Sequence, residues 1–367
     1  MRYVHYYPLA RYDSGVSIAL WAWARALAAA GEEVVVLHAG AWGPTPPQPG
    51  FADIGGTGIA DVEVPHRARR HRLTLHPVDL GRHLGRGDVL VLHEGWVPSN
   101  LVAAKAARRR GVPYLVMPHG VYDPQWMRYL HPPMSLRTRL ERRLLEGALA
   151  VHLFHESEIP EVRAVAPGAR FLVVPTGYDL PPQRWTGGGG YLSWIGRVDI
   201  THKGLDLVVA AIASLPPSER PRLLVHGYDY KGGITRLRRL VADLDLEDCV
   251  RIEGVVAGEE KRAFLQRADG YVHPSRWECH STALLENLAL GVPCLVSSSI
   301  HIAAQLACEG AALLTPPTTE LMGQKLMELV ERGEHLAFCG RSFVSGHFAW
   351  DHIVPAYFGA LRRYGLG

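Results

Sequence analysis

Two carboxylates in the second half of the chain could bind the hydroxyl groups of a ligand. Glu278 lies in a loop after Gly270 to Val272, an apolar run that predicts the end of a buried strand. Glu286 lies in the next segment, whose apolar residues recur at helical spacing from Thr282 until Gly291 to Pro293 end the helix. Because ligands bind beyond the carboxyl ends of strands in an open α/β sheet, both carboxylates are expected at such a crevice. As an alternative, Glu286 only complements the helix dipole and Glu278 is a solvated loop residue.

Two basic residues follow another predicted strand. Arg197 comes at the end of the run that begins at Tyr191, and Lys203 follows six residues later, before a helix expected from about Leu207 to Leu215. Guanidinium and ammonium groups bind phosphate oxygens, so two cations fixed at one edge of the sheet would suit a diphosphate. Either residue alone would be an ordinary surface charge.

A histidine and a glycine occupy comparable positions in the first half. His119 follows the predicted strand Pro113 to Pro118, and Gly15 lies between the predicted strand Arg2 to Tyr7 and the helix Ser17 to Ala30. A neutral imidazole could donate a hydrogen bond to a hydroxyl group or face developing positive charge, and the sequence leaves both roles open. The amides around Gly15 could face a phosphate, although the segment lacks the dinucleotide-binding glycine pattern.

The elements that carry these residues predict two α/β domains with parallel sheets. Strand, helix and strand follow one another at the start of the chain, and the pattern restarts at Tyr191. Pro181 and Pro182, with the four glycines 187–190, indicate a flexible connector between the domains. We expect a first domain over residues 1–182, a second over 183–345, and a final helical segment over 346–367.

Composition narrows the class of protein. The 367 residues are 47% hydrophobic and 20% charged, as in a soluble globular protein with two cores. The net charge of +3 is too small to favour a nucleic-acid partner. Five cysteines without a Cys-x-x-Cys pair favour reduced thiols. With neither a secretion signal nor a spanning segment in the sequence, we expect a cytoplasmic protein.

Two basic stretches could contact an anionic surface. They are His66 to Arg72 and the amphipathic Arg137 to Leu145. Such segments suit a membrane surface, and they are also typical of ordinary solvated helices. We therefore keep peripheral contact with the inner membrane face as an alternative to a purely cytoplasmic location.

Other catalytic motifs are missing from the sequence. It contains no P-loop, no His-Glu-x-x-His and no Gly-x-Ser-x-Gly, so nothing anchors a kinase-like, metalloprotease or serine-hydrolase function. Asp243-Leu244-Asp245 lies in a helical run and predicts a solvated face, not a metal site.

The ordered motifs together resemble family 4 glycosyltransferases. The similarity rests on Pro274-Ser275, Glu278, Glu286 and Gly291-Val292-Pro293, and it continues in the two segments around His119 and Arg197. It spans nearly the entire chain. It implies the α/β GT-B fold, in which two Rossmann-like lobes with parallel sheets face one another across an interdomain cleft. The acceptor would bind the first lobe and the nucleotide sugar mainly the second, and the last helix would cross back to the first lobe.

The resemblance implies a retaining hexosyltransferase that uses no metal and prefers a UDP-sugar to a GDP-sugar. Its acceptor would be a glycan, a lipid-linked molecule or a small molecule. Arg197 and Lys203 would stabilise the leaving diphosphate, and Glu278 would position the donor sugar. The implied catalytic residues are Glu278, His119, Arg197 and Lys203. The implied donor-binding residues are Glu286, Gly15, Gly227, Val256, Cys279, His280, Ser281 and Thr282.

One residue departs from the family pattern, and two other functions fit the same fold. Cys279 stands where the family usually has glycine, and a positive φ there would strain a cysteine by about 1 kcal/mol. The alternatives are a nucleotide-sugar epimerase of the GT-B fold and a non-catalytic nucleotide-sugar-binding protein.

Overall fold

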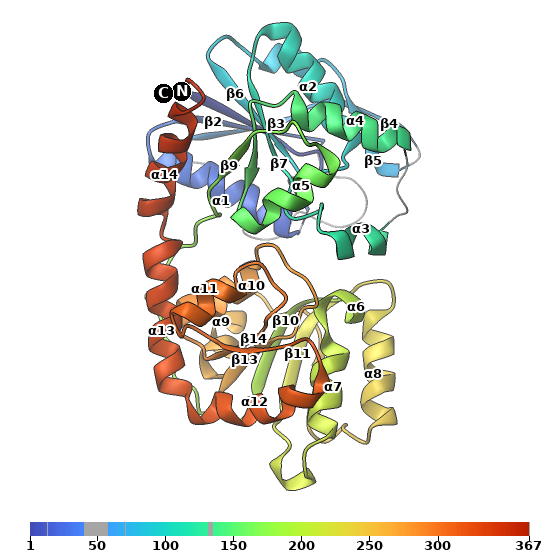
Figure 1. Ribbon diagram of the computed structural model, residues 1–367, viewed down its shortest axis with the longest axis vertical. Helices are drawn as coiled ribbons and strands as arrows, with labels where there is room; N and C mark the ends of the chain where they lie inside the picture. Colours follow the sequence, from blue (N-terminus) through green and yellow to red (C-terminus); the bar gives the residue numbers. More distant parts are fainter. Residues whose placement is uncertain (13, 40–57, 70, 131–134, 367) are drawn as a thin grey trace. The chain divides into compact units, whose positions relative to one another are not determined.

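The chain folds into two compact units. A computed structural model describes residues 1–12, 14–39, 58–69, 71–130 and 135–366. One unit comprises Met1–Gly177 with Trp350–Gly367, and the other comprises Tyr178–Ala349. Each unit contains a sheet of parallel strands connected by helices (Figure 1), which confirms the expected α/β fold class.

The first unit is organised around a seven-stranded parallel sheet with the order β3-β2-β1-β6-β7-β8-β9. Its central strands β1 and β6 are buried almost throughout, as expected for strands that helices cover on both faces, although each contains a histidine. In the neighbouring strand β2, Val34 and Leu37 are fully buried. The strands are β1 (Arg2–Tyr6), β2 (Glu33–His38), β3 (Ile59–Glu63), β6 (Asp88–His93), β7 (Tyr114–Met117), β8 (Ala150–Leu153) and β9 (Phe171–Val173), with β4 (His66–Arg69) and β5 (His71–Pro77) as a separate antiparallel pair.

The last helix, α14 (Trp350–Arg362), packs on the first unit. The ring of Trp23 lies 5.2 Å from that of Trp350 and 4.8 Å from that of Tyr357, and Tyr3 lies 6.1 Å from Tyr357. These aromatic contacts join the two ends of the chain in one core. The other helical segments of this unit are α1 (Gly15–Ala29), η1 (Leu80–His83), α2 (Pro98–Arg110), α3 (Pro124–Leu130), α4 (Ser135–Glu146), η2 (Glu156–Glu158) and α5 (Ile159–Val165).

The second unit repeats the plan with six parallel strands in the order β12-β11-β10-β13-β14-β15. These strands are β10 (Leu192–Val198), β11 (Leu223–Asp229), β12 (Val250–Glu253), β13 (Gly270–His273), β14 (Cys294–Ser297) and β15 (Leu313–Thr315). The helical segments are α6 (Ile200–Lys203), α7 (Leu205–Ala213), η3 (Pro217–Glu219), α8 (Gly233–Asp243), α9 (Gly258–Arg267), α10 (Thr282–Leu290), α11 (Ala303–Cys308), α12 (Thr319–Glu331) and α13 (Gly333–His347). In the described part of the chain, no helix is both long and apolar enough to cross a bilayer.

The segment expected to be a flexible connector is bonded into the second unit. The amide of Trp185 donates to Leu290 O at 2.8 Å, and the amide of Gly189 donates to Arg267 O at 2.8 Å. Arg341 Nη2 donates to the carbonyl oxygen of Pro181, also at 2.8 Å. The interpretation of this segment as flexible was therefore wrong, because its backbone finds partners on the neighbouring elements.

The packing also places the division of the chain differently from the expected limits of 182 and 345. Tyr178 N donates to Phe348 O at 2.7 Å, so the residues after Gly177 and those up to Ala349 belong together in the second unit. α14 begins only at Trp350.

Gly204 lets the turn between α6 and α7 pack against the loop that follows β13. Its φ is +65°, and a Cβ at this position would lie 2.1 Å from the carbonyl oxygen of Pro274. Gly232, the N-cap of α8, has a similar φ of +75°, but a Cβ there would meet no atom within 4 Å. Substituting Gly232 therefore introduces backbone strain alone, whereas substituting Gly204 introduces both backbone strain and steric overlap.

We expect Gly232→Ala to lower the free energy of unfolding by about 1–2 kcal/mol, the cost of a left-handed backbone. Gly204→Ala should lower it by about a further 1–3 kcal/mol, because the new methyl group overpacks the site. Urea unfolding of both variants measures the difference. Equal losses would mean that the loop after β13 yields without cost, contrary to this account.

Candidate functional site

The sheet of the second unit reverses its strand order at β10. β11 and β12 continue on one side of β10, and β13, β14 and β15 continue on the other. In an open α/β sheet, ligands bind outside the carboxyl ends of the strands at such a switch point. Arg197 lies near the end of β10, Lys203 ends α6 directly after it, and Glu278 lies in the loop after β13, so the topology brings these three predicted residues to one edge.

Lys203 and Glu278 form a close ion pair. Lys203 is the last residue of α6, and its Nζ donates to Glu278 Oε2. Their side chains are only 16% and 15% exposed. Asp199 caps α6 by accepting from His202 N at 3.2 Å, and Ser275 Oγ donates to the same Glu278 oxygen at 3.4 Å. A helix cap and a loop hydroxyl therefore fix the pair from both sides.

The environment of Glu278 keeps it ionised. Burial alone would raise its pKa, but the Lys203 ammonium lowers the pKa to about 2, together with His202 and His273 once acid protonates them. Burial lowers the pKa of His202 to about 3 and that of His273 to about 4, so both imidazoles are neutral at pH 7. The Lys203 ammonium is therefore the charge that compensates the carboxylate.

Arg197 is held at the end of β10 by its neighbours. Its Nη2 lies 3.0 Å from His202 Nδ1 and 3.7 Å from Asp199 Oδ2, and its Cζ lies 4.3 Å from the centre of the Tyr230 ring. A guanidinium only donates, so His202 Nδ1 accepts and His202 Nε2–H donates to Trp277 O at 2.9 Å. His202 thus links the Arg197 side chain to the loop of Glu278.

Glu286 lies on α10 and pairs with a residue that the sequence did not indicate. Its Oε1 is 2.7 Å from Lys261 Nζ on α9, and the two side chains are 20% and 34% exposed. Ser281 is the N-cap of α10 and accepts from Leu284 N at 3.3 Å, and Thr282 is the first helical residue. Helix N-termini attract anions, so this end of α10 suits a phosphate.

The remaining predicted residues of the second unit lie on the same loops or on neighbouring strands. Cys279 and His280 are half-buried, and Cys279 does not adopt a positive φ, so the cysteine causes no backbone strain. Gly227 pairs with Gly196 across β10 and β11, where a Cβ would lie 2.0 Å from Gly196 O. Val256 is half-buried in the segment after β12.

His119 and Gly15 belong to the first unit. Gly15 is the first residue of α1, behind the N-cap Ser14, and a Cβ on it would meet no atom within 4 Å. Packing therefore does not require glycine at this position. His119 follows β7 with a φ of +57°, and its Nε2 lies 3.0 Å from His93 Nδ1.

A second group of residues missed by sequence reasoning follows β6. Glu94 accepts a hydrogen bond from Tyr7 Oη at 2.6 Å, and burial raises its pKa. Glu94 and Trp96 have φ values of +65° and +61°. His119, which follows the neighbouring strand β7, is a third residue with a left-handed backbone. Residues other than glycine in this conformation cluster at functional sites. The only sequence signal was their place directly after a predicted strand.

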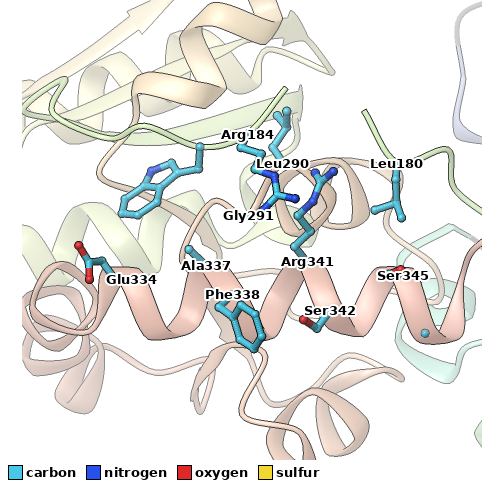
Figure 2. Close-up of a pocket in the computed structure, with 12 residues that line it drawn as sticks. Leu180, Arg184, Leu290, Gly291, Glu334, Ala337, Phe338, Arg341, Ser342 and Ser345 are labelled. Carbon is cyan, nitrogen blue, oxygen red and sulfur yellow. The ribbon is translucent and has the colours of Figure 1, made fainter. Parts of the chain in front are cut away.

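A cavity of about 720 Å³ lies elsewhere in the second unit. It runs along α13, between Trp185, Leu290, Phe338 and Arg341 (Figure 2). Leu290 is the last residue of α10, at the opposite end of this helix from Ser281. None of the predicted site residues lines this cavity.

Two family models match the chain. Residues 187–342 match the glycosyl transferases group 1, and residues 14–177 match the glycosyl transferase 4-like domain. The first match contains the loops of Arg197, Glu278 and Glu286, and the second contains His119.

Curated relatives match part of the chain. GDP-mannose:cellobiosyl-diphosphopolyprenol alpha-mannosyltransferase of Xanthomonas oryzae pv. oryzae (strain PXO99A) is 27% identical over 206 residues, which are 53% of this chain and 52% of that protein. Mannosylfructose-phosphate synthase of Agrobacterium fabrum is 30% identical over 145 residues, which are 34% of this chain and 32% of that protein. The match thus spans about half of the first relative and about a third of the second.

Solved structures are similar over nearly the whole chain. Sucrose-phosphate synthase from Thermosynechococcus elongatus superimposes with a TM-score of 0.80 at 20% identity, covering 99% of this chain and 98% of that one. HepE of Anabaena in complex with UDP-glucose gives 0.77 at 15% identity, covering 99% and 100%. These structures share the fold of the chain. With both family models matched, the chain belongs to the group 1 glycosyltransferases of the GT-B fold.

Proposed function

We propose that the protein is a retaining glycosyltransferase that moves a sugar from a UDP-sugar to an acceptor hydroxyl without a metal ion. The observation that carries the proposal is the convergence of Arg197, Lys203 and Glu278 at the carboxyl ends of β10 and β13. HepE, which shares the fold, is described in complex with UDP and with UDP-glucose. A GDP-sugar is the second choice of donor, since the Xanthomonas relative is named for GDP-mannose.

The proposed chemistry follows from the charges at this edge of the sheet. As the bond from sugar to diphosphate loosens, negative charge grows on the phosphate and positive charge grows on the anomeric carbon. Arg197, Lys203 and the N-terminus of α10 stabilise the leaving diphosphate, each contact contributing about 2–4 kcal/mol. These fixed cations supply the charge that a metal would otherwise provide. Glu278 holds the donor sugar, and its negative charge opposes the developing positive charge.

The rest of the site is proposed to hold the nucleotide and the acceptor. Glu286 accepts from the ribose hydroxyls, with Lys261 orienting the carboxylate through Oε1. The backbone at Gly227 and Val256 contacts the base, and the loop of Cys279, His280, Ser281 and Thr282 contacts the sugar diphosphate. In the first unit, Gly15 and His119 contact the substrates. The acceptor hydroxyl passes its proton to the leaving phosphate. The product would be a glycan, a polysaccharide or another glycoconjugate.

A peripheral membrane contact is proposed for α4. Leu136 and Leu140 are 68% and 37% exposed, one helical turn apart, whereas Leu144 and Leu145 of the same helix are buried. Exposed leucines among arginines suit the surface of an anionic bilayer and a lipid-linked acceptor. The other basic stretch, His66 to Arg72, spans β4 and β5, and its residue 70 lies outside the described residues.

The donor nucleotide can be identified by thermal stabilisation with UDP, GDP, ADP and dTDP, each with magnesium or with a chelator. We expect UDP to stabilise the protein equally in both conditions, by about 2.7 kcal/mol at a hundred times its Kd. Arg197→Ala should abolish the effect. Arg239→Ala, at a residue of the same unit whose side chain is 84% exposed, is the control and should keep it. Stabilisation by magnesium complexes alone would contradict the metal-free site.

The stereochemistry of the product tests the retaining mechanism. With the donor found above and a panel of sugar and lipid-linked acceptors, an α-linked donor should give an α-linked product, which NMR coupling constants identify. A β-linked product would refute retention. Binding of the donor without transfer to any acceptor would instead favour a nucleotide-sugar-binding protein.

The Lys203–Glu278 pair predicts a specific acid dependence of stability. The pKa of Glu278 falls from 4.5 to about 2 on folding, so its contribution is complete above about pH 4.5 and disappears as the pH falls through 2. At about 1.4 kcal/mol per pKa unit, this contribution is of the order of 3 kcal/mol. Glu278→Gln should therefore be less stable than wild type by about this amount at pH 7, and the gap should shrink toward pH 2.

Urea unfolding at several pH values measures the gap. Glu259→Gln is the matched control, because this surface glutamate pairs with Arg262 and is 84% exposed. Its gap from wild type should be small at every pH. A gap for Glu278→Gln that does not change with pH would contradict the buried pair.

A further inference from the structure

Three histidines of the first unit form a hydrogen-bonded chain. His93 Nε2 lies 2.9 Å from His5 Nδ1, and His93 Nδ1 lies 3.0 Å from His119 Nε2. The ring centres of the two pairs are 5.2 and 5.3 Å apart. Both ring nitrogens of His93 are thus hydrogen-bonded to other histidines. The three hydrogen-bonded histidines extend from the core to His119.

The register of the parallel strands produces this arrangement. His5 on β1 is opposite Val91 on β6, and His93 lies two residues further along β6. His93 is opposite Met117 on β7, and His119 lies two residues beyond Met117. Residues two apart on a strand face the same side, so β1 and β6 offer their histidines on one face of the sheet.

Burial makes the inner two histidines neutral. His5 is 1% exposed and His93 is fully buried. Burial lowers the pKa of His5 to about 3 and that of His93 well below its usual value. A neutral imidazole has one N–H donor and one acceptor nitrogen. The hydrogen bonds must therefore all run from His5 toward His119, or all run from His119 toward His5.

The hydrogen bonding of His5, at the buried end of the three histidines, decides between the two directions. His5 Nε2 has no hydrogen-bond partner among the described residues. If the bonds ran inward, this nitrogen would carry a buried N–H without an acceptor, which is rare in folded proteins. If they run outward, it carries only a lone pair. The outward direction costs less, and it makes His119 Nε2 an acceptor.

We propose that His5 and His93 are positioning residues that hold His119 as the neutral tautomer protonated on Nδ1. The tautomer itself does not depend on the proposed function. Only its role in catalysis rests on that function. In that setting His119 offers an N–H donor to a sugar hydroxyl and has no basic nitrogen at Nδ1. This assigns the donor role, one of the two roles that the sequence left open for His119.

The tautomer can be measured on the ligand-free protein. In protein labelled with ¹⁵N at histidine, two-bond ¹H–¹⁵N correlation spectra separate protonated from unprotonated ring nitrogens, and His119→Asn assigns the signals. We expect Nδ1 of His119 to be protonated and Nε2 to be unprotonated at pH 7. A proton on Nε2, or on both nitrogens, would overturn the proposal without any variant of His93.

Two variants of His93 test its part in the chain. His93→Gln keeps a donor and an acceptor and should preserve the tautomer of His119, whereas His93→Leu removes both and should give mixed tautomers. We expect His93→Leu to lower kcat/KM by about 10- to 100-fold, as loss of a residue that orients a functional histidine does. An unchanged tautomer in His93→Leu would refute the positioning role.

His152→Leu is the control for the loss of a buried histidine. His152 lies on β8 of the same sheet, is fully buried, and bonds to Val174 O through Nε2 at 2.8 Å, outside the chain of three. Its removal should leave the His119 tautomer unchanged, and a change would count against the proposal. Because the spectra need no substrate, a failure of glycosyl transfer in the wild type would contradict the proposed function alone.

Discussion

The ion pair of Lys203 and Glu278 is the contact on which the site of the second unit depends. An unpaired carboxylate at this depth would cost several kcal/mol, so Lys203 stabilises Glu278 and the loop after β13 in their observed positions. Lys203 is placed in turn by the cap of α6 and by Gly204, whose missing side chain lets the two loops touch. Capping, close approach and charge pairing therefore act together to bring two distant parts of the chain to one edge.

The two units use opposite electrostatics. The second unit collects charged groups, with Arg197 and Lys203 beside Glu278, as suits a leaving group that gains negative charge. The first unit keeps His5 and His93 neutral through burial and bonds them to one another. A hydroxyl group carries no charge. Neutral hydrogen-bonded histidines can therefore orient it only through the direction of their hydrogen bonds. This contrast is the physical basis for proposing that the second unit binds the nucleotide sugar and the first unit the acceptor.

Local patterns in the sequence sufficed for the parallel sheets and for the edge at which Arg197, Lys203 and Glu278 meet, because strand ends and helix starts leave local signals. The partners of these residues could not be found in this way. His5 and His93 lie far apart in the sequence and meet only through the register of β1 and β6. Lys261 reaches Glu286 only because α9 packs beside α10. The glycines 187–190 predicted flexibility, since composition reports backbone freedom but does not reveal the carbonyl groups that bind this segment.

A crystal structure of the protein with UDP tests the central claim most directly. The account predicts the diphosphate within hydrogen-bond distance of Arg197 and Lys203 and the ribose hydroxyls on Glu286. Nucleotide bound in the cavity along α13, or a diphosphate remote from the Lys203–Glu278 pair, would contradict it.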